Sequence, residues 1–118
     1  MNRTKIKIYC SVFEDKGWGA QIVVKEPWGD KYTIQTCGSK EEGITLPDLV
    51  VKVIDQWLTL NHMEKRSLLT IYPDFDLILP EEWKVKGYKI GQVSTREDQK
   101  RIKFAQQLAE EGAKYYAE

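Results

Sequence analysis

The sequence lacks most of the features that mark a secreted, membrane-spanning or zinc-binding protein. It has no apolar signal core near its N-terminus, and no apolar run approaches the roughly eighteen residues that a spanning helix needs. The two cysteines, Cys10 and Cys37, form no CxxC spacing, and His62 is the single histidine. A zinc site and a histidine-based catalytic triad are therefore not expected. We expect a cytoplasmic protein with reduced thiols, and a Cys10–Cys37 disulfide stays open as an alternative.

Net charge is also absent. Eighteen basic residues balance eighteen acidic residues. No overall positive field draws the chain to nucleic acid, so any such binding must use a local patch. Phosphate-binding loops of the GxxxxGK[ST] or GxGxxG type, placed between a strand and a helix, are missing as well. With 118 residues, the chain has the length of one domain, and we expect residues 1–118 to form it.

The first third of the chain is rich in strand-forming residues. Apolar and polar residues alternate over Lys5–Cys10, and β-branched residues are concentrated in Trp18–Lys25 and Tyr32–Cys37. Between the second and third segments, Pro27 and Gly29 indicate a turn. These three segments therefore predict an antiparallel meander with short connections.

A helix and a fourth strand follow. Thr45 is placed as a helix cap, with Asp48 three residues later, and the helix runs out around residues 60–63. Its apolar residues recur at three- and four-residue spacing: Leu46, Leu49, Val50, Val53, Ile54, Trp57 and Leu58. Ser67–Tyr72 is typical of a strand that Pro73 terminates.

The C-terminal part predicts a short helix, a strand and a long final helix. We expect the short helix around Leu79–Trp83, the strand over Tyr88–Val93, and a cap of the last helix at Ser94 or Thr95. The residues expected to face the core from the last helix are Ile102, Ala105, Leu108, Ala109, Gly112 and Tyr116. The order βββαβ(α)βα indicates a mixed α/β fold with a five-stranded sheet and flanking helices. The third strand should lie at a sheet edge, which leaves a monomer or an edge-strand dimer.

At this stage the chain resembles the ribonuclease H family. The resemblance rests on the element order from about Lys5 to Tyr116, on the segment Gly17-Trp18-Gly19-Ala20 at the start of the second strand, and on Leu108-Ala109 in the last helix. In that family the first strand and the fourth strand each end in a metal-binding Asp. The first helix begins with a catalytic Glu, and the last helix carries a further Asp. The resemblance implies a ribonuclease H-like fold and, where the carboxylates are kept, Mg²⁺-dependent cleavage of nucleic acid.

Three of the four carboxylate positions are substituted in this chain. Ser11 stands at the first Asp, Pro73 at the second with Asp74 one residue later, and Gln106 at the last. Asp48 keeps a shortened carboxylate at the head of the first helix. Two-metal catalysis requires several converging carboxylates. We therefore predict no catalytic residues, no metal cofactor, and a non-catalytic binding or scaffold module for a protein or nucleic-acid partner.

A divergent Mg²⁺-dependent nuclease, acting on an RNA–DNA hybrid or another nucleic acid, is the first alternative. Its ligands would be relocated: a metal set of Asp48, Asp74, Asp76 and Glu14, or a catalytic set of Asp48, Asp74 and Asp15. The structural explanation of the same residues is simpler. Asp48 would complete the helix cap, while Asp74 and Asp76 would flank a solvated turn.

The second alternative is salt-sensitive nucleic-acid binding without cleavage. The candidate residues are Trp18, Lys84, Lys86, Arg96 and Lys100, where Arg96 replaces the family's loop histidine. Acidic residues alternate with these basic ones, so an ordinary solvated surface is the competing interpretation. Trp28, in a turn between two strands, is the candidate anchor for a protein partner.

Overall fold

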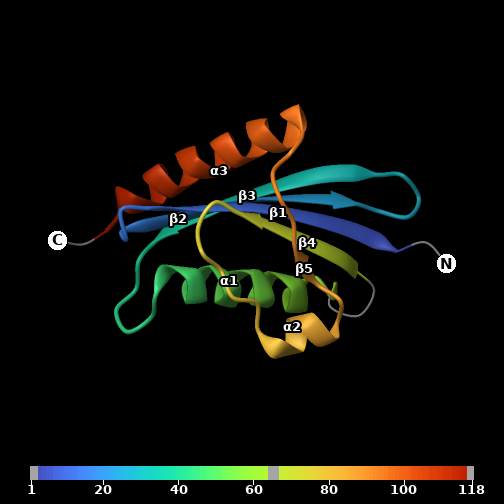
Figure 1. Cartoon of the computed structure of the whole chain (residues 1–118), viewed down its shortest axis with the longest axis horizontal. Coiled ribbons are helices and arrows are strands. Elements are labelled where there is room, and N and C mark those ends of the chain that lie inside the picture. Colours follow the sequence, from blue (N-terminus) through green and yellow to red (C-terminus); the bar gives the residue numbers. More distant parts are fainter. Residues whose placement is uncertain (1–2, 64–66, 117–118) are drawn as a thin grey trace.

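The computed structural model describes residues 3–63 and 67–116 as a five-stranded sheet with helices on both faces (Figure 1). The strands are β1 (Thr4–Phe13), β2 (Gly17–Lys25), β3 (Lys31–Ser39), β4 (Ser67–Pro73) and β5 (Lys89–Ile90). The helices are α1 (Leu46–Leu60), α2 (Glu81–Val85) and α3 (Arg96–Ala113). Within the described ranges, no helix combines the length and apolar composition that a bilayer span requires.

The strand order is β3-β2-β1-β4-β5, with β1 at the centre. β1, β2 and β3 pair antiparallel, whereas β4 pairs parallel with both β1 and β5. The mixed α/β sheet and the edge position of β3 are confirmed. Whether the free edge of β3 pairs with a second copy of the chain stays a prediction.

The fifth strand is much shorter than the predicted Tyr88–Val93. Only Lys89 and Ile90 pair with β4, and the last sheet bond runs from the Gly91 N–H to the Ile71 carbonyl at 2.9 Å. A Cβ on Gly91 would lie 2.6 Å from the Tyr72 ring. Any residue larger than glycine would therefore clash with this ring. The chain then leaves the sheet and crosses to the opposite face, where α3 begins (Figure 1).

The main core lies between the sheet and the layer of α1 and α2. The period-two alternation of β1 and β2 sends one side of each strand into it, and the amphipathic stripe of α1 closes it. Its largest fully buried side chains include Trp83, Ile6, Ile8, Ile22, Leu49 and Ile54. The Trp83 indole N–H donates to the Asp55 carboxylate at 3.3 Å, which ties α2 to α1.

Helix α3 covers the other face and approaches the backbone of the sheet closely. A Cβ on Gly19 would lie 2.5 Å from the Leu108 Cβ and 2.6 Å from the Ala105 carbonyl oxygen. A Cβ on Gly17 would overlap the backbone of Ala113, and the Gly112 position meets the β3 backbone in the same way. The two glycines of Gly17-Trp18-Gly19-Ala20 are therefore the docking surface for α3.

The predicted C-terminal packing is wrong at Tyr116. Helix α3 ends at Ala113, so Tyr116 lies beyond the helical stripe and keeps 37% of its surface exposed. Tyr115 is more exposed still. The remainder of the stripe packs as predicted, with Ile102, Ala105, Ala109 and Gly112 buried and Leu108 half-buried. The cap is Thr95, whose hydroxyl accepts from the Asp98 N–H at 3.0 Å.

Both cysteines are free thiols, so the disulfide alternative is wrong. Cys10 lies opposite Ala20 and Cys37 lies opposite Gly19, which places the two side chains on opposite faces of the sheet with β2 between them. Cys10 is completely buried, and Cys37 is half-buried. Burial, and secondarily a nearby carboxylate, raises the pKa of each thiol, Asp74 being the carboxylate for Cys10 and Glu111 for Cys37.

Alkylation of the native protein is expected to modify Cys37 slowly and Cys10 not at all. The thiolate is the reactive form, and the raised pKa of both groups reduces its population at neutral pH. Peptide mass spectrometry after iodoacetamide treatment, with and without urea, measures the two sites separately. Equal labelling of Cys10 and Cys37 without urea would show that Cys10 is accessible to the reagent, in contradiction to its burial in the core.

Candidate functional site

The site begins with Ser11, which lies inside β1 rather than after it. The predicted strand end at Cys10 is too early, because pairing with β2 continues to Phe13. Ser11 lies opposite Gly19 on the α3 face of the sheet and is only 2% exposed. Its hydroxyl donates a hydrogen bond of 2.9 Å to Oδ2 of Asp74.

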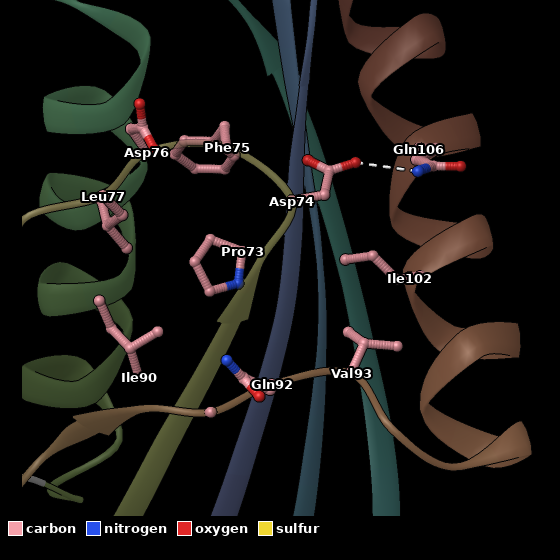
Figure 2. A pocket seen from close by; sticks show the side chains of 11 residues that line it. Pro73, Asp74, Phe75, Asp76, Leu77, Ile90, Gln92, Val93, Ile102 and Gln106 are labelled. Atoms are coloured by element: carbon pink, nitrogen blue, oxygen red, sulfur yellow. Dashed lines mark hydrogen bonds between the residues drawn. The ribbon is translucent and has the colours of Figure 1, made fainter.

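Asp74 is the point where three distant segments meet. It directly follows β4, and its backbone N–H donates to the Cys10 carbonyl at 3.2 Å. The Gln106 side chain reaches down from α3 and donates from Nε2 to the same Oδ2 at 2.9 Å (Figure 2). Ser11, Asp74 and Gln106, which the resemblance placed at or beside carboxylate positions of one site, are thus brought together in space.

A shallow cleft of about 620 Å³ opens beside Asp74, between the ends of β4 and β5 and α3. Apolar side chains form much of its wall, and its polar groups come from Asp74, Asp76, Gln92 and Gln106. Figure 2 shows Asp74 on the side of α3 and Asp76 on the side of α1, with Phe75 between them. The two carboxylates therefore do not converge.

The relocated metal site is not assembled. Asp48 lines a different hollow, with Asp55 and α2, and its backbone N–H donates to Thr45 Oγ1 at 3.3 Å as part of the helix cap. Glu14 and Asp15 occupy the β1–β2 turn. Their ion pairs are with Lys16 Nζ and Lys40 Nζ, both at 3.9 Å. Across residues 3–63 and 67–116, no three His, Cys, Asp or Glu side chains gather as a metal would require.

The donor set around Asp74 does not fit a pair of Mg²⁺ ions. Hard cations prefer oxygen ligands, and holding two of them side by side for hydrolysis needs several converging carboxylates. Here one carboxylate accepts hydrogen bonds from a hydroxyl and an amide, which are neutral donors. The arrangement suits a structural acceptor that joins β1, β4 and α3.

The basic residues proposed for nucleic-acid binding do not form one patch. Lys84 and Lys86 belong to the α2 region, whereas Arg96 and Lys100 are on α3, across the sheet (Figure 1). Lys84 Nζ lies 4.0 Å from a Glu81 carboxylate oxygen, and Lys86 Nζ lies 5.9 Å from the centroid of a tyrosine ring. These four candidate residues therefore lie on two separate faces of the sheet.

The two candidate tryptophans differ in their exposure. Trp18 is 5% exposed, because it points into the α1 side of the core and packs against Gly38. A base cannot stack on it, so the nucleic-acid role predicted for Trp18 is wrong. Trp28 is 71% exposed in the β2–β3 turn, and its indole N–H donates to Asp30 Oδ2 at 2.7 Å. Its role as a partner anchor stays a prediction.

Sequence reasoning missed a buried polar pair beneath α3. The Tyr9 hydroxyl donates to Asp98 Oδ1 at 2.6 Å, and the Tyr9 ring stacks on Tyr72 with centroids 4.7 Å apart. Burial alone would raise the pKa of the Asp98 carboxyl, but the hydrogen bonds from Tyr9, Ser94 and Thr95 together hold that pKa below its ordinary value. Burial and the bond to Asp98 raise the pKa of Tyr9 well above its ordinary value. The sequence signal was Tyr9 itself, a large aromatic on the otherwise polar side of an alternating strand.

Comparison with known proteins places the fold. No protein-family model matches the sequence, and no curated protein matches it. Among solved structures, the chain is similar to LC9-RNase H1, a type 1 ribonuclease H with the type 2 active-site motif, with a TM-score of 0.59 and 14% identity. That likeness covers 99% of this chain and 75% of the other.

Two further ribonuclease H structures superpose more loosely. LC11-RNase H1, isolated from compost by a metagenomic approach, has a TM-score of 0.48 and 7% identity, over 94% of this chain and 98% of the other. The N-terminal ribonuclease H domain of Rv2228c from Mycobacterium tuberculosis has a TM-score of 0.41 and 11% identity, over 94% and 97%. Together with the strand order and the flanking helices, the similarity to LC9-RNase H1 shows that this chain has the ribonuclease H-like fold.

Proposed function

We propose that the chain is a non-catalytic ribonuclease H-like module that binds a protein or nucleic-acid partner. The observation that carries the proposal is the environment of Asp74. The hydroxyl of Ser11 and the amide of Gln106 both donate to its Oδ2, at 2.9 Å each. Donors of this kind satisfy a lone carboxylate without a cation, and they add no negative charge that would attract one.

The surroundings of Asp74 support the same proposal. Asp76 lies beyond Phe75, and Asp48 lines a separate hollow, so neither adds its charge to that of Asp74. Fold alone does not carry an activity, because the activity depends on the groups that form the site. Free thiols at Cys10 and Cys37 suit a reducing compartment, and we place the module in the cytoplasm.

The test is a cleavage reaction. A labelled RNA–DNA hybrid is incubated with the protein and with Mg²⁺ or Mn²⁺, beside an active ribonuclease H as the positive control. We expect no cleavage above the protein-free background with either ion, and no shift of the melting temperature on adding Mg²⁺.

Two matched variants decide what any cleavage would mean. Asp74→Asn and Asp48→Asn each remove one carboxylate, from the two separate hollows. Cleavage by the wild-type chain that is lost in Asp74→Asn would overturn the proposal and reveal a divergent nuclease centred on Asp74. Cleavage that survives in both variants would point to a contaminating nuclease, which repeated purification of the wild-type chain must then remove.

A further inference from the structure

Three lysines form a row across the sheet, far from Asp74. Lys5 on β1 lies directly opposite Lys25 on β2, and Lys25 lies directly opposite Lys31 on β3. Paired residues on neighbouring strands point to the same face, so all three side chains lie on the α3 face. Adjacent strands are about 4.8 Å apart, which places the Cα atoms of the three lysines within roughly 10 Å.

In the described part of the chain, no ion pair neutralises the positive charges of this row. Like charges directly opposite each other destabilise a sheet, and here two such pairs share Lys25. Among the described residues, no ion pair joins any of these three lysines to a carboxylate. A stretch of sheet that retains repulsion of this kind is suited to an anionic ligand, because such a ligand would relieve it.

The lysines line a groove rather than a flat surface. Its volume is about 320 Å³, and Lys7 and Arg101 add two further positive charges to its walls. The buried side chains of Tyr9 and Val23 form its floor. Glu97 is the single acidic residue among the described residues that line this groove. Its Oε1 forms an ion pair with Arg101 Nη2 at 2.8 Å. Helix α3 begins short of this end of the sheet (Figure 1).

An exposed aromatic side chain lies in the turn next to the row. Trp28 lies in the turn that joins Lys25 to Lys31, and its indole is fixed by the 2.7 Å bond to Asp30. The turn itself is closed by a bond from the Glu26 N–H to the Asp30 carbonyl at 2.8 Å. Glu26 lines a neighbouring hollow together with Lys5 and Lys25. Burial, and then the charge of Glu26, raises the pKa of the Tyr32 phenol.

We propose that this lysine row and Trp28 together bind single-stranded nucleic acid. The proposal names the partner class of the proposed function and rests on it. Lysines spaced along a groove contact successive phosphates, and an exposed indole stacks on a base that is not paired. A duplex keeps its bases stacked inside and offers no free base face to Trp28, which favours a single strand. The groove is separate from the Asp74 cleft, because Lys5 and Ser11 are roughly 20 Å apart along β1.

The first measurement is binding of a short fluorescein-labelled oligothymidylate, followed by anisotropy over a series of salt concentrations. EDTA is present throughout, so that cleavage cannot contribute. Contacts from the three lysines of the row and from Lys7 predict that the logarithm of the association constant falls with the logarithm of salt concentration with a slope of roughly −3. Affinity that ignores salt would overturn the proposal, as would tighter binding to anionic lipid vesicles or to a duplex of the same sequence.

Matched charge removals locate the site. Lys25→Gln with Lys31→Gln removes two positive charges from the row, and we expect affinity at about 0.1 M salt to fall roughly 25-fold. Lys84→Gln with Lys86→Gln removes two charges from the α2 side and should leave affinity unchanged. Equal losses in the two double variants would mean that only overall charge matters, and the proposed site would be wrong.

Lys25→Gln alone separates binding from folding. It removes both like-charge pairs at once, so we expect the melting temperature to rise while affinity falls about fivefold. A destabilised protein cannot produce that combination.

Trp28→Ala is expected to weaken binding about tenfold without changing the salt slope. Cleavage of the hybrid in the Mg²⁺ reaction would refute the non-catalytic function while leaving this binding result intact, so the two failures are distinguishable.

Discussion

Gly19→Val is expected to lower the free energy of unfolding by about 3 kcal/mol or more and to loosen α3 from the sheet. The side chain would have to enter a space that the Ala105 carbonyl and the Leu108 Cβ already fill, since even a Cβ would lie 2.6 and 2.5 Å from them. Overpacking against backbone cannot be relieved by a change of rotamer, so it falls at the costly end of the known range. Urea unfolding followed by far-UV circular dichroism measures the change.

Gly43→Ala is the matched control. Gly43 has a φ of 83° and no other atoms near its Cβ position, so alanine there is strained only by its backbone conformation. The expected cost is about 1 kcal/mol. Similar losses in the Gly19 and Gly43 variants would show that close approach of α3 to β2 is not what requires glycine in Gly17-Trp18-Gly19-Ala20.

Asp98→Ala is expected to destabilise the protein by about 3 kcal/mol at neutral pH. Asp98 is buried, and it accepts from the Tyr9 hydroxyl and the Ser94 N–H. Removing the carboxylate leaves the hydroxyl of Tyr9 buried without its partner, and unpaired buried donors are expensive. A double-mutant cycle with Tyr9→Phe measures how much of the loss belongs to this contact. Additive losses in the cycle would mean that the contact contributes nothing.

The same pair predicts loss of stability at both ends of the pH scale. The pKa of Asp98 is lowered in the folded state, so its contribution is present above the unfolded carboxyl pKa of about 4 and is lost as pH falls through the folded value. The pKa of Tyr9 is raised, so its contribution is present below about pH 10 and is lost as pH rises beyond that.

Asp98→Asn tests the acidic side of this dependence. It keeps an acceptor for Tyr9 and removes the titrating carboxyl, so the decrease in stability between pH 5 and pH 3 should be smaller than in the wild-type chain. Glu97→Gln, which alters an exposed neighbour, is the control. An unchanged acid slope in Asp98→Asn would assign the pH dependence to other carboxylates.

Much of the fold could be predicted because its elements are locally encoded. The alternation of apolar and polar residues predicted β1. The three- and four-residue spacing of apolar residues after Thr45 predicted α1 almost to the residue. β5 and Tyr116 could not be predicted in the same way. A two-residue strand carries no periodicity of its own, and the last turn of a helix depends on whether the sheet still lies beneath it.

The sites depend on register, which local sequence does not contain. The resemblance brought Ser11, Asp74 and Gln106 to one corner, but their mutual hydrogen bonds required coordinates. The sequence shows that Lys5 and Lys25 are polar positions in strands. Only the pairing fixed by the β1–β2 and β2–β3 turns makes them direct neighbours. The opposite exposures of Trp18 and Trp28 have the same origin, since a strand residue and a turn residue meet different surroundings.

The hydrogen bonds around Asp74 also affect the stability cost of placing further acidic residues beside it. A cluster of carboxylates repels itself until cations neutralise it, so a site of that kind lowers the stability of the empty protein. Here the three segments attract one another instead, through Ser11, Asp74 and Gln106. Introducing a single acid at Ser11 or Gln106 would break one of these bonds and add repulsion, with no metal yet bound in return. Each acid introduced at this corner is therefore expected to lower the stability of the protein before a complete set of carboxylates could bind a metal.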